Sequence, residues 1–211
     1  MILVDTPGLV AAGRPAFADM VGGLDESQLS SPTLCEGWDV HTLTAHMLLP
    51  FEVTFARFAF ASLRHRGNTA RTVDALTRRI ATRPTTDLVA ELRSHARTQV
   101  APRRVGPEAQ LVETAVHLRD VARPLGLDAD VPLKHWRAVL DYLVSASVAP
   151  DVMPRGRLDG LAPTATDQDW RHSHGQGLEG TSEAIAMALT GRAVALDDLD
   201  GPGRDVLAGR L

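Results

Sequence analysis

The chain has 211 residues, of which 44% are hydrophobic, and its formal net charge is −4. This length and apolar content are enough for one domain, or one domain and a smaller second segment, with a packed core. The mild negative charge is not typical of a nucleic-acid-binding protein. The single cysteine, Cys35, excludes an intramolecular disulfide and is compatible with a reducing compartment.

The beginning of the sequence and its apolar runs predict where the protein acts. The first ten residues, MILVDTPGLV, lack the basic start and the long apolar run of a signal peptide. No run of about 18 apolar residues is present, so we expect no membrane span. We therefore expect a soluble, cytoplasmic protein with no nucleic-acid or membrane partner.

Helical periodicity begins near the N-terminus. Thr6 or Asp5 can cap a first helix that has Pro7 in its first turn and ends at Gly22 and Gly23. Residues 25–34 are expected to form a connector to the second helix.

The second helix carries the first candidate site residue. Asp39 fits its N-cap, because the carboxylate can accept backbone N–H groups of the first turn. Val40, Leu43 and Met47 recur at helical spacing, and His46 lies beside this apolar stripe. The helix pattern alone leaves two interpretations of His46, a buried histidine that only forms hydrogen bonds and a metal ligand, and it favours the former.

Pro50 removes a backbone N–H group and predicts a kink, after which the helix is expected to resume. All five phenylalanines lie between residues 17 and 60, and several recur at helical spacing together with Leu63. We expect these side chains to form the core of a helical bundle.

Further helices are predicted over residues 72–82, from Thr85 or Thr86 onward, and over residues 133–148. We expect His95 to be exposed, and residues 102–107 to form a linker.

A helix predicted between Gly106 and Gly126 contains a second group of candidate residues. Glu113 and His117 are four residues apart, and Asp120 follows three residues later, so all three lie on one side of the helix. Two ligands at this spacing can bind one metal ion. The apolar side of the helix lies largely opposite, so the spacing alone favours a solvated face over a metal site.

Residues 151–211 differ in character from the helices before them. We expect two short extended segments over residues 157–170, a helix over residues 179–190, and a turn with a short helix at the end. His172 and His174 form a His-x-His pattern in a polar, glycine-rich stretch, which favours an exposed loop over a second metal site.

Two segments resemble the mycothiol-dependent maleylpyruvate isomerase family. PTLCEGWDVHTLTAHM resembles that family's P-T-x-C-x-G-W-x-V-x-x-L-x-x-H segment, and VETAVHLRDVARPLG resembles its E-x-x-x-H-x-x-D-x-x-R-P-L-G segment. The resemblance implies a mainly α fold, with a DinB-like four-helix bundle over residues 1–150 and a small α+β segment over residues 151–211. We expect this tail to be shorter than the C-terminal domain of the full isomerases.

The same resemblance implies a metal site, because His46, Glu113 and His117 fall on the family's ligand positions. Three protein ligands leave one coordination position open, as in catalytic zinc sites. That position can take a thiol, which coordination deprotonates, or a water molecule. The implied cofactors are Zn²⁺, or another divalent metal, and mycothiol, with Asp120 orienting a ligand. The implied partners are a small electrophilic substrate and the thiol.

Three functions stay open. The first is a mycothiol-dependent transferase or isomerase, the second a metal-dependent hydrolase or lyase using bound water, and the third a helical-bundle binding protein without enzymatic activity. Cys35 is the rival nucleophile, but we expect a packed, inert thiol. Arg123 faces an anionic substrate or forms a salt bridge, and we favour the salt bridge. The sequence does not indicate the substrate or the oligomeric state.

Overall fold

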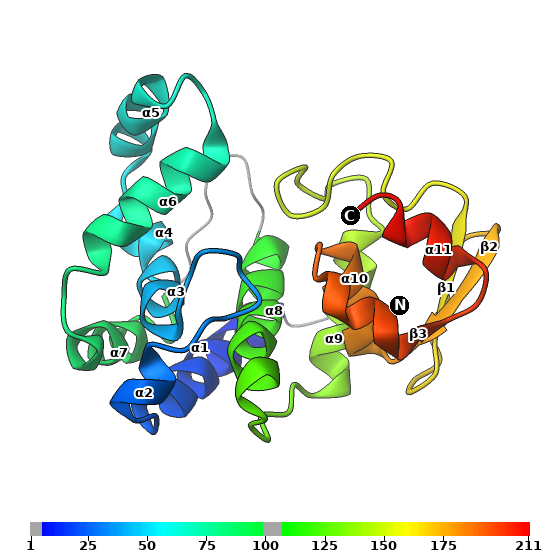
Figure 1. The fold of residues 1–211 in the computed structure, drawn as a ribbon, viewed down its shortest axis with the longest axis horizontal. Coiled ribbons are helices and arrows are strands. Elements are labelled where there is room, and N and C mark those ends of the chain that lie inside the picture. Colours follow the sequence, from blue (N-terminus) through cyan, green and yellow to red (C-terminus); the bar gives the residue numbers. More distant parts are fainter. Residues whose placement is uncertain (1–5, 99–106) are drawn as a thin grey trace. The chain divides into compact units, whose positions relative to one another are not determined.

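The computed structural model describes residues 6–98 and 107–211, which fall into two compact units (Figure 1). As far as their residues are described, the helical unit comprises Pro7–Pro107 and His117–Ala129, and the mixed unit comprises Met1–Thr6, Glu108–Val116 and Asp130–Leu211. Helix α8 (Pro107–Leu125) contributes to both. Asp5 and residues 102–106 lie outside the described residues, and the predicted domain boundary at residue 150 stays a prediction.

The helical unit is built from short helices around a core of large aliphatic side chains. Besides part of α8, its helices are α1 (Thr6–Gly22), α2 (Glu26–Leu29), α3 (Val40–His46), α4 (Leu49–Glu52), α5 (Phe55–Arg64), α6 (Thr69–Ile80) and α7 (Thr85–Ser94). Helix α3 packs against α6 and α7. Its Leu43 is fully buried, as are Phe17 of α1 and Leu92 of α7. The segment 25–34 is more than a connector, because Asp25 and Gln28 form a capping box that starts α2.

Helix α3 begins as predicted but ends earlier. The carboxylate of Asp39 accepts a hydrogen bond from the Thr42 N–H group at 2.7 Å. The helix then ends at His46, and Pro50 lies in the first turn of the separate helix α4. Proline is tolerated there because first-turn N–H groups have no partner within the helix. The predicted kink is therefore wrong, since the chain breaks into two helices before Pro50.

Helix α5 contradicts the prediction of a phenylalanine core. No residue of α5 is buried, and the exposed fractions of Phe55, Phe60 and Leu63 are 63%, 61% and 77%. Phe17 is the one phenylalanine in the buried core. The helical spacing was correct, but three of the large apolar side chains of α5 are mostly exposed.

The next two helices were also predicted, over residues 72–82 and from Thr85 or Thr86 onward, and each buries apolar side chains. Leu76 and Ile80 of α6 are buried, as are Leu88, Val89 and Leu92 of α7. His95, which was expected to be exposed, is half-buried, and its ring stacks on Phe51 with 4.2 Å between the ring centroids.

Residues on both faces of helix α8 are buried, although the sequence pattern indicated that only the apolar face would be. Leu111 and Leu118 are buried as expected, but so are Thr114, His117 and Asp120. The interpretation of the latter side as a solvated face is therefore wrong. A carboxylate and an imidazole in such surroundings require specific partners, because burying a polar group without hydrogen bonds is costly.

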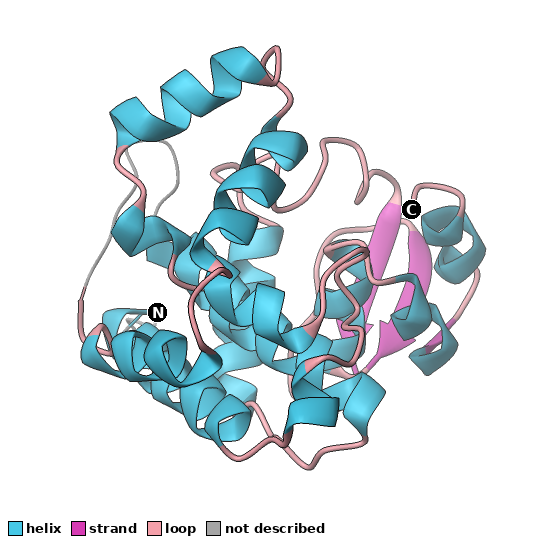
Figure 2. Cartoon of the chain, turned by 60° about the vertical axis from the view of Figure 1, so that its left-hand side comes forward, coloured by secondary structure: helices cyan, strands magenta, loops and turns pink. Residues whose placement is uncertain are grey.

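The mixed unit holds all the strands of the described chain (Figure 2). Strands β1 (Leu161–Ala165) and β2 (Gln176–Gly180) pair in parallel, and β3 (Leu199–Asp200) pairs antiparallel to β2. One of the two extended segments expected over residues 157–170 is confirmed at β1, whereas β2 lies outside that range. Gly180 is required, since a Cβ atom there would lie 2.8 Å from the backbone carbonyl oxygen of Asp198.

The helices of the mixed unit are α9 (Leu133–Leu143), α10 (Ser182–Leu189), the 3₁₀ helix η1 (Ala193–Asp198) and α11 (Gly203–Ala208). Every residue of helix α10 except Glu183 is buried, and the helix packs against α9 and η1. The prediction of a mainly α protein with a small C-terminal α+β segment is confirmed. Among the described residues, no helix combines the length and the apolar character needed to cross a membrane.

Candidate metal site

The turn before α3 is closed by its own polar groups. The Thr33 hydroxyl donates to the Trp38 carbonyl at 2.9 Å and accepts from the Cys35 N–H group at 3.1 Å. The Trp38 N–H group donates to the Cys35 carbonyl at 3.0 Å. Gly37 has φ +77°, a left-handed conformation in which glycine is strongly favoured. These contacts account for the threonine and the glycine of the segment, and they hold the backbone of Cys35 and Trp38 in fixed places.

His46 is the last residue of α3 and lies between two other rings. The Trp38 ring is tilted against it, with 4.8 Å between the ring centroids. The His117 ring of α8 meets it nearly at a right angle, with 5.1 Å between centroids. The structure thus brings together two histidines that are far apart in the sequence.

His117 is oriented by a carboxylate on its own helix. Its Nδ1 atom lies 2.8 Å from Oδ2 of Asp120, one turn further along α8, and the two residues are 7% and 0% exposed. Since a carboxylate only accepts hydrogen bonds, we infer that Nδ1 carries the proton. The other nitrogen, Nε2, then has a lone pair that suits a metal ion.

Glu113 lies one turn before His117 on α8 and completes a set of possible metal ligands. One donor atom from each of His46, Glu113 and His117 lies within 4.8 Å of the other two. Two imidazole nitrogens and one carboxylate are ligands that Zn²⁺ binds, and with three of them a fourth position stays open. The three residues are therefore grouped as the sequence resemblance implied, and their binding of a metal stays a prediction.

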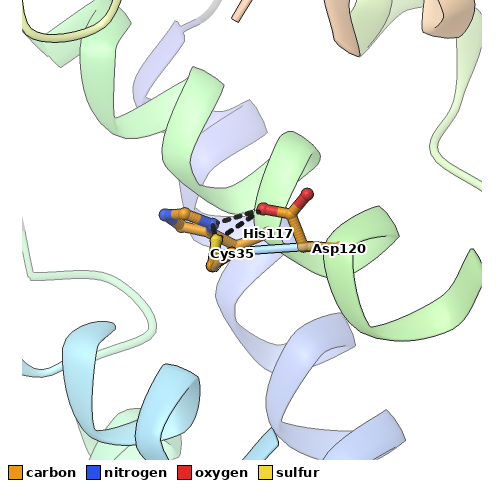
Figure 3. A group of neighbouring side chains, drawn as sticks. All are labelled: Cys35, His117 and Asp120. Atoms are coloured by element: carbon orange, nitrogen blue, oxygen red, sulfur yellow. Dashed lines mark hydrogen bonds and ion pairs between the residues drawn. The ribbon is translucent and has the colours of Figure 1, made fainter. Parts of the chain in front are cut away.

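Cys35 was expected to be a packed, inert thiol, but the structure places it beside two of the candidate site residues. Its Sγ atom lies 3.2 Å from Oδ2 of Asp120 and 3.7 Å from Nδ1 of His117 (Figure 3). The thiol is half-buried and belongs to a second group of possible metal ligands, Cys35, His117 and Asp120. Cys35 and His46 belong to the same short sequence motif, and this is the feature from which its proximity to the site could have been predicted.

Other candidate residues are not part of the cluster. His172 and His174 belong to no group of three or more potential metal ligands among the described residues. His174 is exposed and His172 half-exposed, which agrees with a loop. Arg123 is half-buried, and its predicted salt bridge stays a prediction.

The fold and this cluster define a mainly helical protein with a candidate metal site formed by two of its helices. A family model described as the mycothiol maleylpyruvate isomerase N-terminal domain matches residues 10–117. The chain belongs to this family, as its two motifs predicted.

Solved structures agree with this assignment at the level of the fold. The crystal structure of the mycothiol-dependent maleylpyruvate isomerase superposes with a TM-score of 0.61 at 16% sequence identity, covering 96% of this chain and 93% of that chain. A His-to-Ala mutant of that isomerase gives a TM-score of 0.60 with the same identity and coverage. No curated protein sequence matches the chain. The expectation of a shortened tail is wrong, because the match extends over nearly the whole solved chain.

Proposed function

We propose that the protein is a metal-dependent enzyme that uses a low-molecular-weight thiol, mycothiol, in transfer to, or isomerisation of, a small electrophilic substrate. One observation carries the proposal: His46, Glu113 and His117 are grouped in a chain of the mycothiol maleylpyruvate isomerase N-terminal family. The solved structures that share the fold are described as mycothiol-dependent isomerases.

The residues of the cluster fit a divalent metal ion. Asp120 accepts a hydrogen bond from Nδ1 of His117, so Nε2 is the nitrogen available for binding. His46 is held at the end of α3 beside the Trp38 ring, and Glu113 supplies a carboxylate from the turn preceding His117. Zn²⁺ is our first choice, since a His₂Glu set is typical of catalytic zinc sites.

The metal would supply a positive charge that stabilises a thiolate near neutral pH, where a free alkyl thiol is mostly protonated. The protein's own side chains would orient the two histidine ligands. The Trp38 ring restricts His46 on one side, and Asp120 fixes the tautomer of His117. The substrate electrophile would then meet a thiol whose position is set by these side chains. A reducing compartment such as the cytoplasm suits a thiol cofactor, and we place the protein there.

Metal analysis tests the site directly. Purified protein should carry close to one divalent ion per chain, and His46→Ala and His117→Ala should each lose stoichiometric binding. His174→Ala is the matched control, because this histidine is exposed and lies outside the cluster. Full metal content in both cluster variants would show that the assignment of the ligands is wrong.

Titration of cobalt-substituted protein with mycothiol tests the use of a thiol. Direct sulfur binding should produce a new sulfur-to-cobalt charge-transfer band, and Glu113→Gln should weaken it. Conjugation of mycothiol to a generic electrophile should be lost in parallel. Cobalt that is bound but shows no spectral response to mycothiol would favour a hydrolase or lyase that uses bound water. A protein that binds no metal would favour a non-enzymatic helical-bundle binding protein.

A further inference from the structure

The thiol of Cys35 and the Nδ1–H group of His117 converge on the same oxygen atom, Oδ2 of Asp120 (Figure 3). We propose that Cys35 is a positioning residue, whose S–H group holds the Asp120 carboxylate so that the carboxylate keeps His117 in its Nδ1–H tautomer. The inference rests on the proposed function in one respect, that Nε2 of His117 serves as a metal ligand.

Burial makes the orientation of Asp120 dependent on its donors. Its side chain is 0% exposed, and a buried carboxylate is costly unless hydrogen bonds and charges compensate it. The S–H group at 3.2 Å and the imidazole N–H group at 2.8 Å approach the same oxygen from different segments of the chain. Two donors on one oxygen restrict rotation of the carboxylate more than either would alone.

The turn that carries Cys35 is itself attached to Asp120. The Leu34 N–H group donates to the backbone carbonyl of Asp120 at 3.1 Å, next to the thiol contact. The Thr33–Trp38 turn therefore binds α8 through a backbone bond and a side-chain bond to one residue. It is also the turn that places the Trp38 ring against His46. One short turn thus orients both histidines, His46 through Trp38 and His117 through Cys35 and Asp120.

The geometry argues against a nucleophilic role for Cys35. A cysteine activated by a histidine–aspartate pair contacts one ring nitrogen while the carboxylate contacts the other. Here both Sγ of Cys35 and Oδ2 of Asp120 lie beside Nδ1 of His117, at 3.7 and 2.8 Å. The carboxylate therefore competes with the thiol for the same nitrogen and cannot act through the ring.

The geometry also argues against Cys35, His117 and Asp120 as a metal site of their own. Two nitrogen or oxygen ligands of one tetrahedral zinc ion lie roughly 3.3 Å apart, given the usual bond lengths. Nδ1 of His117 and Oδ2 of Asp120 are 2.8 Å apart, which is a hydrogen-bond distance. The group is therefore a hydrogen-bonded cluster that supports the neighbouring ligands.

Zinc affinity and the cobalt spectrum test the role of Cys35. Cys35→Ala, which removes the donor, should lower zinc affinity roughly tenfold, whereas Cys35→Ser, which keeps a donor, should stay close to wild type. Wild-type cobalt protein without added thiol should show no sulfur-to-cobalt band. Such a band, absent in Cys35→Ser, would make Cys35 a ligand and overturn the proposal.

The tautomer of His117 in metal-free protein provides a readout independent of metal and activity. Long-range ¹H–¹⁵N spectra of histidine-labelled protein, assigned with His117→Ala, should show a single Nδ1–H tautomer in wild type and in Cys35→Ser. Cys35→Ala should show a mixture of tautomers. A single Nδ1–H tautomer together with unchanged zinc affinity in Cys35→Ala would overturn the proposal. A wild-type protein that binds no metal would contradict the proposed function, and the tautomer spectra would still decide the role of Cys35.

Discussion

The indole ring of Trp38 packs against the imidazole ring of His46, with 4.8 Å between centroids, while its Nε1–H group donates to the carboxylate of Asp74 at 2.8 Å. Burial raises the pKa of Asp74, but hydrogen bonds from Trp38 and Arg78 outweigh it and the pKa is lowered. The carboxylate therefore stays charged and tethers the turn before α3 to α6. The same residue, Trp38, thus contacts both α6 and the candidate ligand at the end of α3.

Two substitutions of Trp38 should distinguish the effect of its hydrogen bond to Asp74 from the effect of its ring contact with His46. Trp38→Phe keeps an aromatic ring beside His46 but loses the donor to Asp74, at a cost of about 1 kcal/mol in the free energy of unfolding. Trp38→Ala loses both and should cost about 3 kcal/mol. It should also weaken zinc binding roughly tenfold, because His46 loses a neighbour that orients it. Urea denaturation and zinc competition measure the two effects, and unchanged zinc affinity in Trp38→Ala would show that the ring does not orient His46.

Removal of the metal should lower stability without unfolding the protein. The core of the helical unit consists of aliphatic and aromatic side chains such as Phe17, Leu43 and Leu92, which are fully buried. Metal that binds the folded state adds stability by mass action, about 2.7 kcal/mol at a free concentration of 100 times Kd. Chelation should therefore lower the melting temperature and leave the far-UV circular dichroism signal unchanged. Loss of that signal on chelation would indicate a structural metal site.

Local signals in the sequence predicted the start of α3, whereas the grouping of His46 with Glu113 and His117 was implied by the family resemblance. Asp39 caps the helix through a contact three residues away, which composition and spacing alone can indicate. The contact between Cys35 and Asp120 joins residues 85 positions apart, and no local pattern encodes it. The two motifs suggested that their residues meet, but only the fold shows which atom of Asp120 receives both donors.

Periodicity also failed to predict what covers each helix face. Helix α5 has an apolar face that is exposed, and α8 has a polar face that is buried. Both follow from the same limit, because spacing shows where apolar residues lie on a helix but not what packs against them. Burial of a polar face, as at His117 and Asp120, is instead decided by partners that lie elsewhere in the chain.

The exposed face of α5 should tolerate polar residues. Phe60→Ser and Leu63→Ser should each change the free energy of unfolding by less than about 0.5 kcal/mol, since both side chains are mostly exposed. Phe17→Ala, in contrast, should cost about 4 kcal/mol, because Phe17 is 0% exposed. Chemical denaturation of the three variants measures these differences. A cost above 2 kcal/mol for either serine variant would show that the face of α5 is covered in solution.

Stability should fall in mild acid because of His135, which lies in α9 and is 6% exposed. Burial lowers the pKa of His135, and the neighbouring charge of Lys134 acts in the same direction. In the unfolded chain the imidazole takes up a proton near pH 6.5, whereas in the folded protein it stays neutral to a lower pH. Between these two pKa values the unfolded state binds more protons, so the stability falls as the pH decreases.

Comparison with His135→Gln isolates this contribution from that of the carboxylates. The free energy of unfolding of wild type minus that of His135→Gln should be constant above pH 7 and should decrease from about pH 6.5 downward. The decrease should stop below the folded-state pKa, where both states of the wild-type chain are protonated at this residue. His174→Gln is the matched control, since it makes the same substitution at an exposed position. Denaturation curves at half-unit steps between pH 5 and 8 measure the difference, and parallel curves for wild type and His135→Gln would contradict the assignment of the acid sensitivity to His135.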